Sequence, residues 1–341
     1  MRGATSVASI IGGIAASHGP LLCVPPTLWH LRGDADRKSK AHNFRGEVMD
    51  YEALLARRAP GLDAQVQPVE QQRQYDACQR ALDDLAARFA TFKADAAIIV
   101  GNDQREAFQD DVSPALTVYT GAQIENIPLD ATRLAGLPPG IREAEIGHCP
   151  PGGATYPGLP SVAEALVASL VEQDFDITTS ARLPKGADRQ DGIPHAYGFI
   201  YRRILQDAPP PTIPVFVNVG VPPNQVRPTR ALAFGRALAK AVQSLPGDAR
   251  VVLIASGGMS HFVVDEALDR KVLAALGPWD ESTLAAIPDS HLRGNTSELK
   301  SWLVVASALH QAGLQPSSVA YAACYRTPAG TGSGMGFVAW G

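Results

Sequence analysis

Short apolar runs alternate with amphipathic stretches along most of the chain. The apolar runs lead into Gly, Asn or Ser, which predicts buried strands at residues 7–16, 94–103, 212–220 and 250–258. Between them, apolar residues recur at spacings of three and four, as in the stripe from Tyr75 to Phe92, which predicts helices. Strands that alternate with helices are typical of an α/β fold with a central mixed sheet flanked by helices.

Weaker patterns complete the outline of the fold. They predict further strands at 115–125, 175–183, 318–327 and 335–340, and helices at 50–60, 161–173, 234–245 and from about 265 to 312. Residues 29–66 are otherwise polar and irregular, and the Pro/Gly-rich residues 137–160 predict a long surface loop. Because no repeat or linker divides the chain, we expect a single domain over residues 1–341.

Composition excludes several classes of protein. With 45% hydrophobic and 19% charged residues, the chain is typical of a globular protein with a sizeable core. A net charge of −4 without a Lys/Arg block gives no basis for binding nucleic acid or an anionic membrane. The four cysteines are scattered without a CxxC pair, which favours reduced thiols in the cytoplasm over a disulfide framework. The first 20 residues faintly resemble a signal peptide. Two glycines break their apolar part, so we interpret this apolar part as the first strand.

Polar side chains capable of chemistry follow several of the predicted strands. In open α/β sheets, ligands bind beyond the carboxyl ends of the strands. His18 follows the first strand, Asn102-Asp103-Gln104 the second, and Ser256-Gly-Gly-Met-Ser-His261 the strand at 250–258, with Glu266 close behind; His195 follows a turn in "GIPHAYGF". Imidazole and carboxylate groups together suit Fe(II), Zn²⁺ or Mn²⁺, so these pieces predict a site for one divalent metal.

Each of these pieces also has a purely structural interpretation. His261 can belong to a tight turn whose serines cap the next helix, or it can support the site without binding the metal. The remaining histidines, His30, His42, His148, His291 and His310, are interpreted as ordinary core or surface residues.

Five segments in a fixed order carry a family resemblance: "ASHGPLL", "VGNDQREAF", "GIPHAYGF", "ASGGMSHF" and "NTSELKSW". On these segments the chain resembles the LigB-type (class III) extradiol ring-cleavage dioxygenases, the superfamily of the protocatechuate 4,5-dioxygenase catalytic subunit. Within it, the chain is most similar to the branch of gallate and 3-O-methylgallate dioxygenases. The resemblance extends from about residue 10 to residue 340.

This resemblance implies a non-haem Fe(II) held by two histidines and one glutamate. His18 matches the first histidine, and Glu266, after the "GGMSH" turn, matches the glutamate. His195 matches the histidine that moves protons during ring opening, and Ser297 matches a serine that contacts the substrate. His261 is expected to support the metal site from behind its ligands.

The second histidine ligand is where the chain departs from the family. The usual motif is Asn-Asp-His, whereas this chain has Asn102-Asp103-Gln104. Gln104 can bind the metal through its amide oxygen, Asp103 can take over as ligand, or the site can bind metal poorly and serve another purpose. Asn102 is expected to hold the loop by hydrogen bonds. A further histidine that the family often carries is missing from the helix at 161–173.

The implied reaction opens the ring of a catechol- or gallate-type aromatic acid with O2, next to its two hydroxyls. The metal lowers the pKa of the hydroxyls, and a neutral His195 accepts a proton and returns it later. In the Gly-rich tail, Arg326 with its neighbour Tyr325 can bind the substrate carboxylate. The alternative is that Arg326 is a surface residue in a turn.

The resemblance also implies a homo-oligomer and leaves room for a small separate lid subunit. Two other functions remain open on the sequence alone. One is a zinc-dependent hydrolase on the same scaffold, because zinc accepts the same ligands. The other is a metal-free binding protein or subunit, which the change to Gln104 supports.

Overall fold

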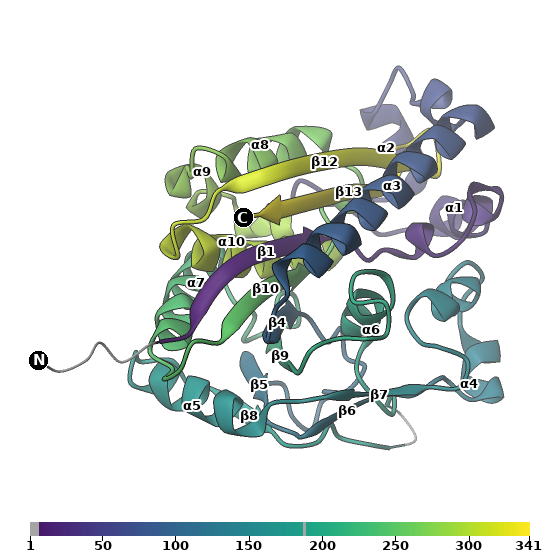
Figure 1. Cartoon of the computed structure of the whole chain (residues 1–341). Coiled ribbons are helices and arrows are strands. Elements are labelled where there is room, and N and C mark those ends of the chain that lie inside the picture. Colours follow the sequence, from purple (N-terminus) through teal and green to yellow (C-terminus); the bar gives the residue numbers. More distant parts are fainter. Residues whose placement is uncertain (1–6, 187–188) are drawn as a thin grey trace, which may run out of the picture.

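A mixed β-sheet runs through the protein, whose computed structural model describes residues 7–186 and 189–341 (Figure 1). The sheet has nine strands in the order β11-β13-β1-β10-β4-β9-β5-β8, with β12 paired to β13. Its strands are β1 (Ser9–Ala16), β4 (Ala96–Gly101), β5 (Leu116–Tyr119), β8 (Thr178–Ser180), β9 (Thr212–Val217), β10 (Arg250–Ser256), β11 (His261–Val263), β12 (Pro316–Tyr325) and β13 (Thr331–Trp340). The predicted α/β fold with a central mixed sheet is confirmed.

The middle of the sheet is parallel and its sides are antiparallel. Neighbours β1, β10, β4 and β9 all run in the same direction. On one side, β13 pairs antiparallel with β1, which places the last strand of the chain beside the first. On the other side, β5 pairs antiparallel with β9. The carboxyl ends of β1, β10 and β4 therefore meet at one edge of the sheet.

Helices cover both faces of the parallel strands. The helices are α1 (Trp29–Lys38), α2 (Tyr51–Arg57), α3 (Pro68–Phe92), α4 (Ala131–Gly136), α5 (Pro160–Val171), α6 (His195–Arg203), α7 (Pro228–Gln243), α8 (Glu266–Leu276), α9 (Glu281–Ala285) and α10 (Leu299–Gln311). In β4, Ala97 and Ile99 pack with residues of α3 and α6, whereas Ile98 and Val100 pack with residues of α5, α7 and α10. A strand buried on both faces needs apolar residues throughout, which is why these strands appear as continuous runs in the sequence.

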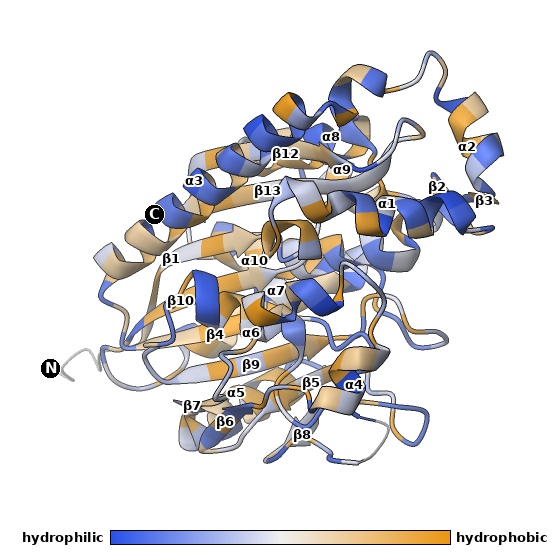
Figure 2. Ribbon diagram, turned by 90° about the vertical axis from the view of Figure 1, so that its right-hand side faces the viewer, coloured by the Kyte–Doolittle hydropathy of each residue, from blue (hydrophilic) through white to orange (hydrophobic). Residues whose placement is uncertain are grey.

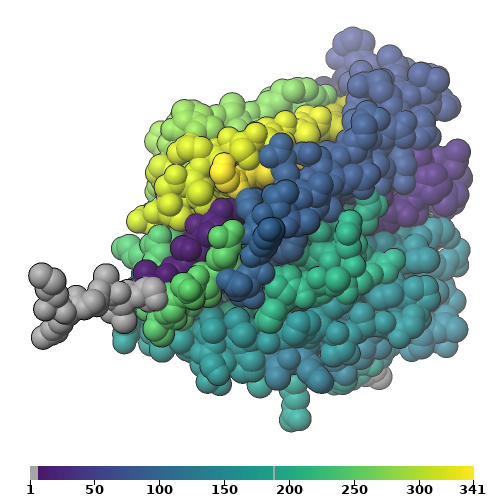
Figure 3. Space-filling view, viewed as in Figure 1, coloured from purple at the N-terminus to yellow at the C-terminus, as the bar shows by residue number. Residues whose placement is uncertain are grey.

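The outer surfaces of the helices are polar. Figure 2 shows hydrophobic residues gathered on the strands and hydrophilic residues on the outer sides of α1 and α3. On the face shown in Figure 3, α3 lies between the C-terminal strands and the middle part of the chain. Among the described residues, none of the helices combines the length and the apolar character needed to cross a bilayer.

Three local predictions need correction. The run 115–125 forms two strands, β5 and β6 (Gln123–Asn126), because Gly121 allows a turn so tight that a Cβ there would lie 2.4 Å from the Ala181 carbonyl oxygen. The predicted surface loop 137–160 contains β7 (Ala154–Pro157), which pairs with β6. The polar segment 29–66 contains α1, which has few apolar residues and therefore no helical stripe to detect.

Candidate metal-binding and active site

Four chain segments bring polar side chains to the carboxyl edge of the parallel strands. His18 lies two residues beyond β1, and Gln104 lies three residues beyond β4. His261 begins β11, a few residues after β10. The fourth segment is the short 3-10 helix η6 (Gly294–Glu298), which ends at Glu298 immediately before α10.

Glu298 lies at the centre of this cluster and is only 1% exposed. Its Oε2 is 3.4 Å from Nε2 of His18 and 3.4 Å from Nε2 of His261. The same oxygen accepts a hydrogen bond of 2.6 Å from the backbone amide of Gly258. Its other oxygen, Oε1, accepts a hydrogen bond from Nε2 of Gln104. One buried carboxylate thus connects the ends of β1, β4 and β10.

Hydrogen bonds at the far side of each ring fix which nitrogen carries the proton in the neutral form of both histidines. Nδ1 of His261 lies 2.7 Å from the Met259 carbonyl oxygen, which can only accept, so this nitrogen carries a proton. Nδ1 of His18 lies 2.9 Å from the Ser256 hydroxyl, and that hydroxyl donates its own hydrogen to the Ala196 carbonyl oxygen. The hydroxyl oxygen therefore accepts from Nδ1 of His18. In the neutral rings, both Nε2 lone pairs face the Glu298 carboxylate.

This arrangement fits a bound cation. Burial acts to raise the pKa of Glu298, but the two imidazoles outweigh it and hold the pKa well below its ordinary value. Burial lowers the pKa of His18 despite the attraction of Glu298, so this ring favours its neutral form. Burial also acts to lower the pKa of His261, but there Glu298 outweighs it and raises the pKa. An imidazole lone pair and a carboxylate oxygen repel each other unless a proton or a metal ion lies between them. Two imidazoles and one carboxylate form a donor set that suits Fe(II) and similar metals.

The spacing of the three side chains supports the same interpretation. The separation of 3.4 Å exceeds the about 2.7–2.9 Å of a charge-assisted hydrogen bond. It is close to the spacing of neighbouring ligands around an ion whose bonds measure about 2.0–2.2 Å. Within residues 7–186 and 189–341, no group of three or more His, Cys, Asp or Glu side chains could hold a metal ion in the arrangement seen here. Because Glu298 lies directly against both rings, its carboxylate has to shift when an ion binds.

Neighbouring groups fix the positions of His261 and Glu298 relative to each other. The Thr296 hydroxyl accepts a hydrogen bond of 3.1 Å from the amide of His261 and donates one of 2.9 Å to its carbonyl oxygen. Gly258 is required by close approach, because a Cβ there would lie 2.2 Å from Cε1 of the His261 ring. The glycines of "GGMSH" therefore allow the imidazole and the backbone amide to reach the same carboxylate.

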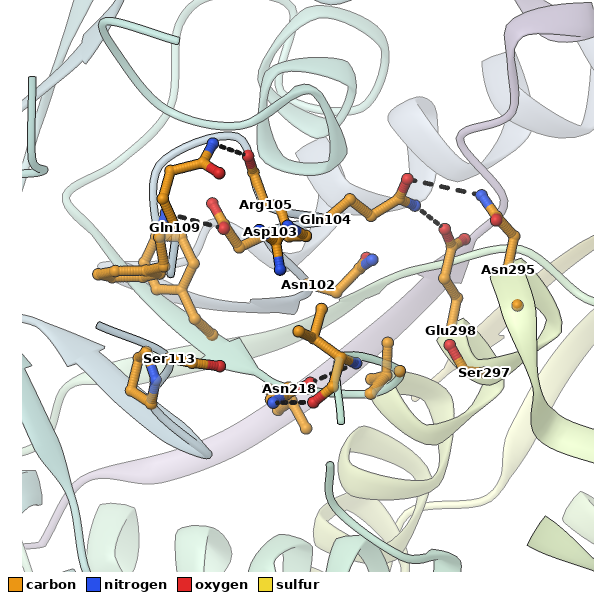
Figure 4. A pocket seen from close by; sticks show the side chains of 18 residues that line it. Asn102, Asp103, Gln104, Arg105, Gln109, Ser113, Asn218, Asn295, Ser297 and Glu298 are labelled. Atoms are coloured by element: carbon orange, nitrogen blue, oxygen red, sulfur yellow. Dashed lines mark hydrogen bonds between the residues drawn. The ribbon is translucent and has the colours of Figure 1, made fainter. Parts of the chain in front are cut away.

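Of the residues in the Asn102-Asp103-Gln104 loop, only Gln104 contacts Glu298. The carboxylate of Asp103 accepts the backbone amides of Ala107 at 2.8 Å and Phe108 at 2.9 Å, so it closes the turn. Gln104 and Arg105 have φ of +50° and +63°, a left-handed conformation that is strained for such residues. Figure 4 shows Gln104 reaching toward Glu298 and Asn295, while Asp103 lies in the turn. Asp103 is therefore not brought to the cluster.

Asn102 faces a cavity and does not hold the loop as expected. Its Oδ1 is buried and has no hydrogen-bond partner in the described part of the chain. The cavity, named here the first cavity, has a volume of about 250 Å³, and its walls include Asn102, Gln104, Phe108, Phe216, Ser297 and Glu298. An engineered cavity of about 150 Å³ is enough for benzene, so the first cavity has room for one substituted ring.

Three other predicted residues lie away from the cluster. The Glu266 carboxylate accepts the Tyr325 hydroxyl at 2.8 Å and the Arg270 guanidinium at 2.9 Å at the start of α8. Glu266 and Tyr325 are thus hydrogen-bonded to each other. Arg326 is buried and donates from Nε to Asp36 at 2.8 Å, so it is neither a surface residue nor part of the first cavity.

His195 lies beside the cluster at the start of α6. Its ring centroid is 5.0 Å from that of His18. Glu106 holds His195 twice, by accepting its backbone amide at 2.8 Å and by binding Nδ1. Burial acts to lower the pKa of His195, but Glu106 outweighs it and raises the pKa to about 9. Glu106 therefore favours the protonated form of the ring, whereas the sequence predicted a neutral one.

Three residues of the site escaped the sequence analysis. Glu298 lies inside "NTSELKSW" and Glu106 inside "VGNDQREAF", so both were visible in the segments that carry the family resemblance. His148 had no such signal, yet its ring lies 5.2 Å from that of His195. It supplies a second histidine beside His195 although the helix at 161–173 has none.

Comparison with known proteins identifies the family of the chain. The chain matches the family described as the catalytic LigB subunit of aromatic ring-opening dioxygenase over residues 60–329. It is 29% identical over 150 residues to a 2,3-dihydroxyphenylpropionate/2,3-dihydroxicinnamic acid 1,2-dioxygenase of Paraburkholderia phymatum, covering 42% of this chain and 44% of the relative. It is 33% identical over 100 residues to the enzyme of the same name from Comamonas testosteroni, covering 29% of each. The matched part thus spans less than half of either relative.

Proposed function

Because the chain belongs to the family of the catalytic LigB subunit of aromatic ring-opening dioxygenases, we propose that it is an extradiol dioxygenase. Its substrate is a catechol-type aromatic acid, whose ring it opens with O2 beside the two hydroxyls. The observation that carries this proposal is the position of Glu298 Oε2, which is 3.4 Å from Nε2 of both His18 and His261. The names of the two relatives, which refer to dihydroxylated phenylpropionate and cinnamate, support an acid as the substrate.

His18, His261 and Glu298 would hold the metal, with Glu298 in the role that the sequence analysis gave to Glu266. We propose that the metal is Fe(II). Opening a ring with O2 requires a redox-active metal, and zinc has no redox chemistry. When bound, the metal acidifies the hydroxyls of the substrate and holds both reactants together. Gln104 holds the second oxygen of Glu298 from the side of the first cavity.

The first cavity receives the ring of the substrate. Phe108 and Phe216 form an apolar wall, with ring centroids 5.5 Å apart. Ser297 lies in the opposite polar wall beside Glu298, where its hydroxyl can contact the substrate (Figure 4). The unpaired Oδ1 of Asn102 is an acceptor for a substrate hydroxyl. These groups orient the ring toward Glu298.

His195 exchanges protons with the substrate through Nε2. Its Nδ1 is committed to Glu106, which leaves Nε2 as the nitrogen available for a proton transfer. Its ring packs edge-on against His18 at a centroid distance of 5.0 Å, so it lies next to a metal ligand. The second carboxylate, Glu106, thus orients the ring in the way that an acid or base residue requires.

Metal content and O2 uptake of protein purified without oxygen test the proposal. The substrate panel contains 2,3-dihydroxyphenylpropionate, protocatechuate and gallate. We expect near-stoichiometric iron and one O2 consumed for each ring opened. Zinc without O2 uptake would instead identify a hydrolase, and absence of any metal would identify a binding protein or subunit.

A further inference from the structure

A second cavity of about 300 Å³ lies next to the first. Its walls include Arg32, His42, His261, Phe262, Arg293 and Asn295. Gly294 and Asn295 line both cavities, and His261 connects the second cavity to the Glu298 cluster. The second cavity thus reaches the proposed metal site from another side.

Arg32 lines the second cavity, and its guanidinium has no anionic partner among the described residues. Its Nε is buried and unpaired, and Arg32 makes no hydrogen bond or ion pair within residues 7–186 and 189–341. Its guanidinium lies over the Phe262 ring, whose centroid is 6.0 Å from Cζ of Arg32. Arg293, which is exposed, likewise has no hydrogen bond or ion pair to any described residue. A partly buried guanidinium without an anion is unfavourable unless a ligand supplies one.

The charges in and behind the cavity wall bear on this point, because Asp36 also lines the cavity. Arg326 also packs on Phe262, with Cζ 5.3 Å from the ring centroid, and its Nη1 is buried and unpaired in the described structure. Asp36 is the nearby carboxylate, and it already accepts Nε and Nη2 of Arg326 and the Thr331 hydroxyl. Burial lowers the pKa of Arg326 despite Asp36, and the charge of Arg32 lowers it further. Asp36 is thus paired with Arg326, and in the described part of the chain it makes no hydrogen bond or ion pair with Arg32.

We propose that the second cavity is a carboxylate-binding pocket that holds the acid group of the aromatic substrate, with Arg32 as its anchor and Arg293 at its rim. This inference rests on the proposed function for the identity of the substrate. A guanidinium without an anionic partner can bind a carboxylate through its N–H groups. The first cavity is less suited to the acid, because Arg105 in its wall is paired with Asp110 at 2.7 Å and Glu298 adds negative charge, whereas the carboxylate in the second cavity, Asp36, is paired with Arg326.

The first test compares two substrates that differ only in charge. Turnover of 2,3-dihydroxyphenylpropionate and of its primary amide is measured for the wild type, Arg32→Gln, Arg32→Lys and Arg37→Gln. Arg37 is a matched control, because it lies on the same helix and is exposed and paired with Asp34. For Arg32→Gln we expect kcat/KM for the acid to fall about 10- to 100-fold, the effect of losing a charged hydrogen bond. The amide should react equally with all variants, and Arg32→Lys should recover part of the loss.

The second test does not depend on turnover. Binding of 3-phenylpropionate, 3-phenylpropanamide and inorganic phosphate to wild type and Arg32→Gln is measured by calorimetry. We expect the acid to bind more tightly than the amide, and this preference to disappear in Arg32→Gln. If turnover fails with every catechol but this binding pattern is found, the proposed function falls and the pocket remains. Equal binding of acid and amide would overturn the pocket, and phosphate binding as tightly as the acid would overturn the substrate as its occupant.

Discussion

Gln104 donates a hydrogen bond from its side-chain amide to Oε1 of Glu298. The family resemblance implies a histidine ligand at position 104. With glutamine at this position, the side chain would hold the proposed ligand Glu298 instead of binding the metal itself. Because Oε2 of Glu298 remains directed at His18 and His261, the carboxylate keeps one oxygen for the metal. In the proposed site His261 takes the place of the missing imidazole, which would make the Asn-Asp-Gln sequence compatible with metal binding.

Gln104→Ala should weaken the metal site without destroying it. Loss of a group that orients a metal ligand typically lowers metal affinity or activity about 10- to 100-fold. Titration of apoprotein with Fe(II) under nitrogen should therefore show weaker binding that still reaches one metal per chain. Gln109→Ala, in the same loop and at the same cavity, is the control. If Gln104→Ala binds no metal at any concentration, Gln104 is itself a ligand.

His195→Ala should keep the metal and lose turnover. We expect kcat to fall by about 10²- to 10⁴-fold, the usual contribution of a positioned acid or base. Glu106→Gln should act in the same direction with a smaller effect, because it removes the carboxylate that orients Nδ1. Stopped-flow measurement of O2 uptake, together with iron analysis, checks both variants. His30→Ala, at an exposed position, should behave like the wild type, and metal loss in His195→Ala would contradict the assigned role.

Gly258→Ala should disrupt the cluster through a steric clash. The new Cβ would lie 2.2 Å from Cε1 of His261, so the ring has to move away from Glu298. Overpacking of this kind costs about 1–3 kcal/mol. We expect a lower melting temperature and loss of most of the bound metal. Gly136→Ala, where no atom lies within 4 Å of the added Cβ, is the control. A fully loaded Gly258→Ala protein would show that the ring position is not needed.

Asp269 should make stability depend on pH. This carboxylate is fully buried, and burial raises its pKa from the ordinary value of 3.8 to about 6. A raised pKa means that the folded state binds the proton more tightly, so the stabilisation is greatest below pH 4 and is lost as the pH rises to about 6. The loss amounts to about 3 kcal/mol. Asn does not titrate, so the stability of the wild type relative to Asp269→Asn should fall over this window in urea unfolding experiments. A constant difference from pH 4 to 7 would contradict this.

The sequence was sufficient to identify the central strands, because their burial on both faces leaves continuous apolar runs such as 94–103. It also placed His18 and His261 correctly beyond strand ends, since that position follows from the order of the elements alone. It could not select Glu298 over Glu266. Both follow the "GGMSH" turn, and only the fold of η6 against β11, through Thr296 and His261, brings Glu298 back to Gly258.

The local sequence pattern also could not predict which charged residues line the second cavity. Arg326 lies in a Gly-rich turn and resembles a surface residue, but the pairing of β13 with β11 buries it against Asp36 of α1. The partners involved are separated by about 290 residues, and α1 itself has no apolar stripe to indicate its position. Contacts over such distances depend on tertiary packing rather than on local sequence.

The metal content of Glu298→Gln, measured beside that of Glu266→Gln, decides which of the two glutamates binds the metal. Both variants replace a glutamate with the same neutral amide, and both residues follow the same turn in the sequence. After anaerobic purification and loading with Fe(II), we predict that Glu298→Gln retains little or no iron, while Glu266→Gln binds as much as the wild type. Full iron occupancy in Glu298→Gln would contradict the account, and loss of iron in Glu266→Gln alone would return the ligand to the residue that the family resemblance first indicated.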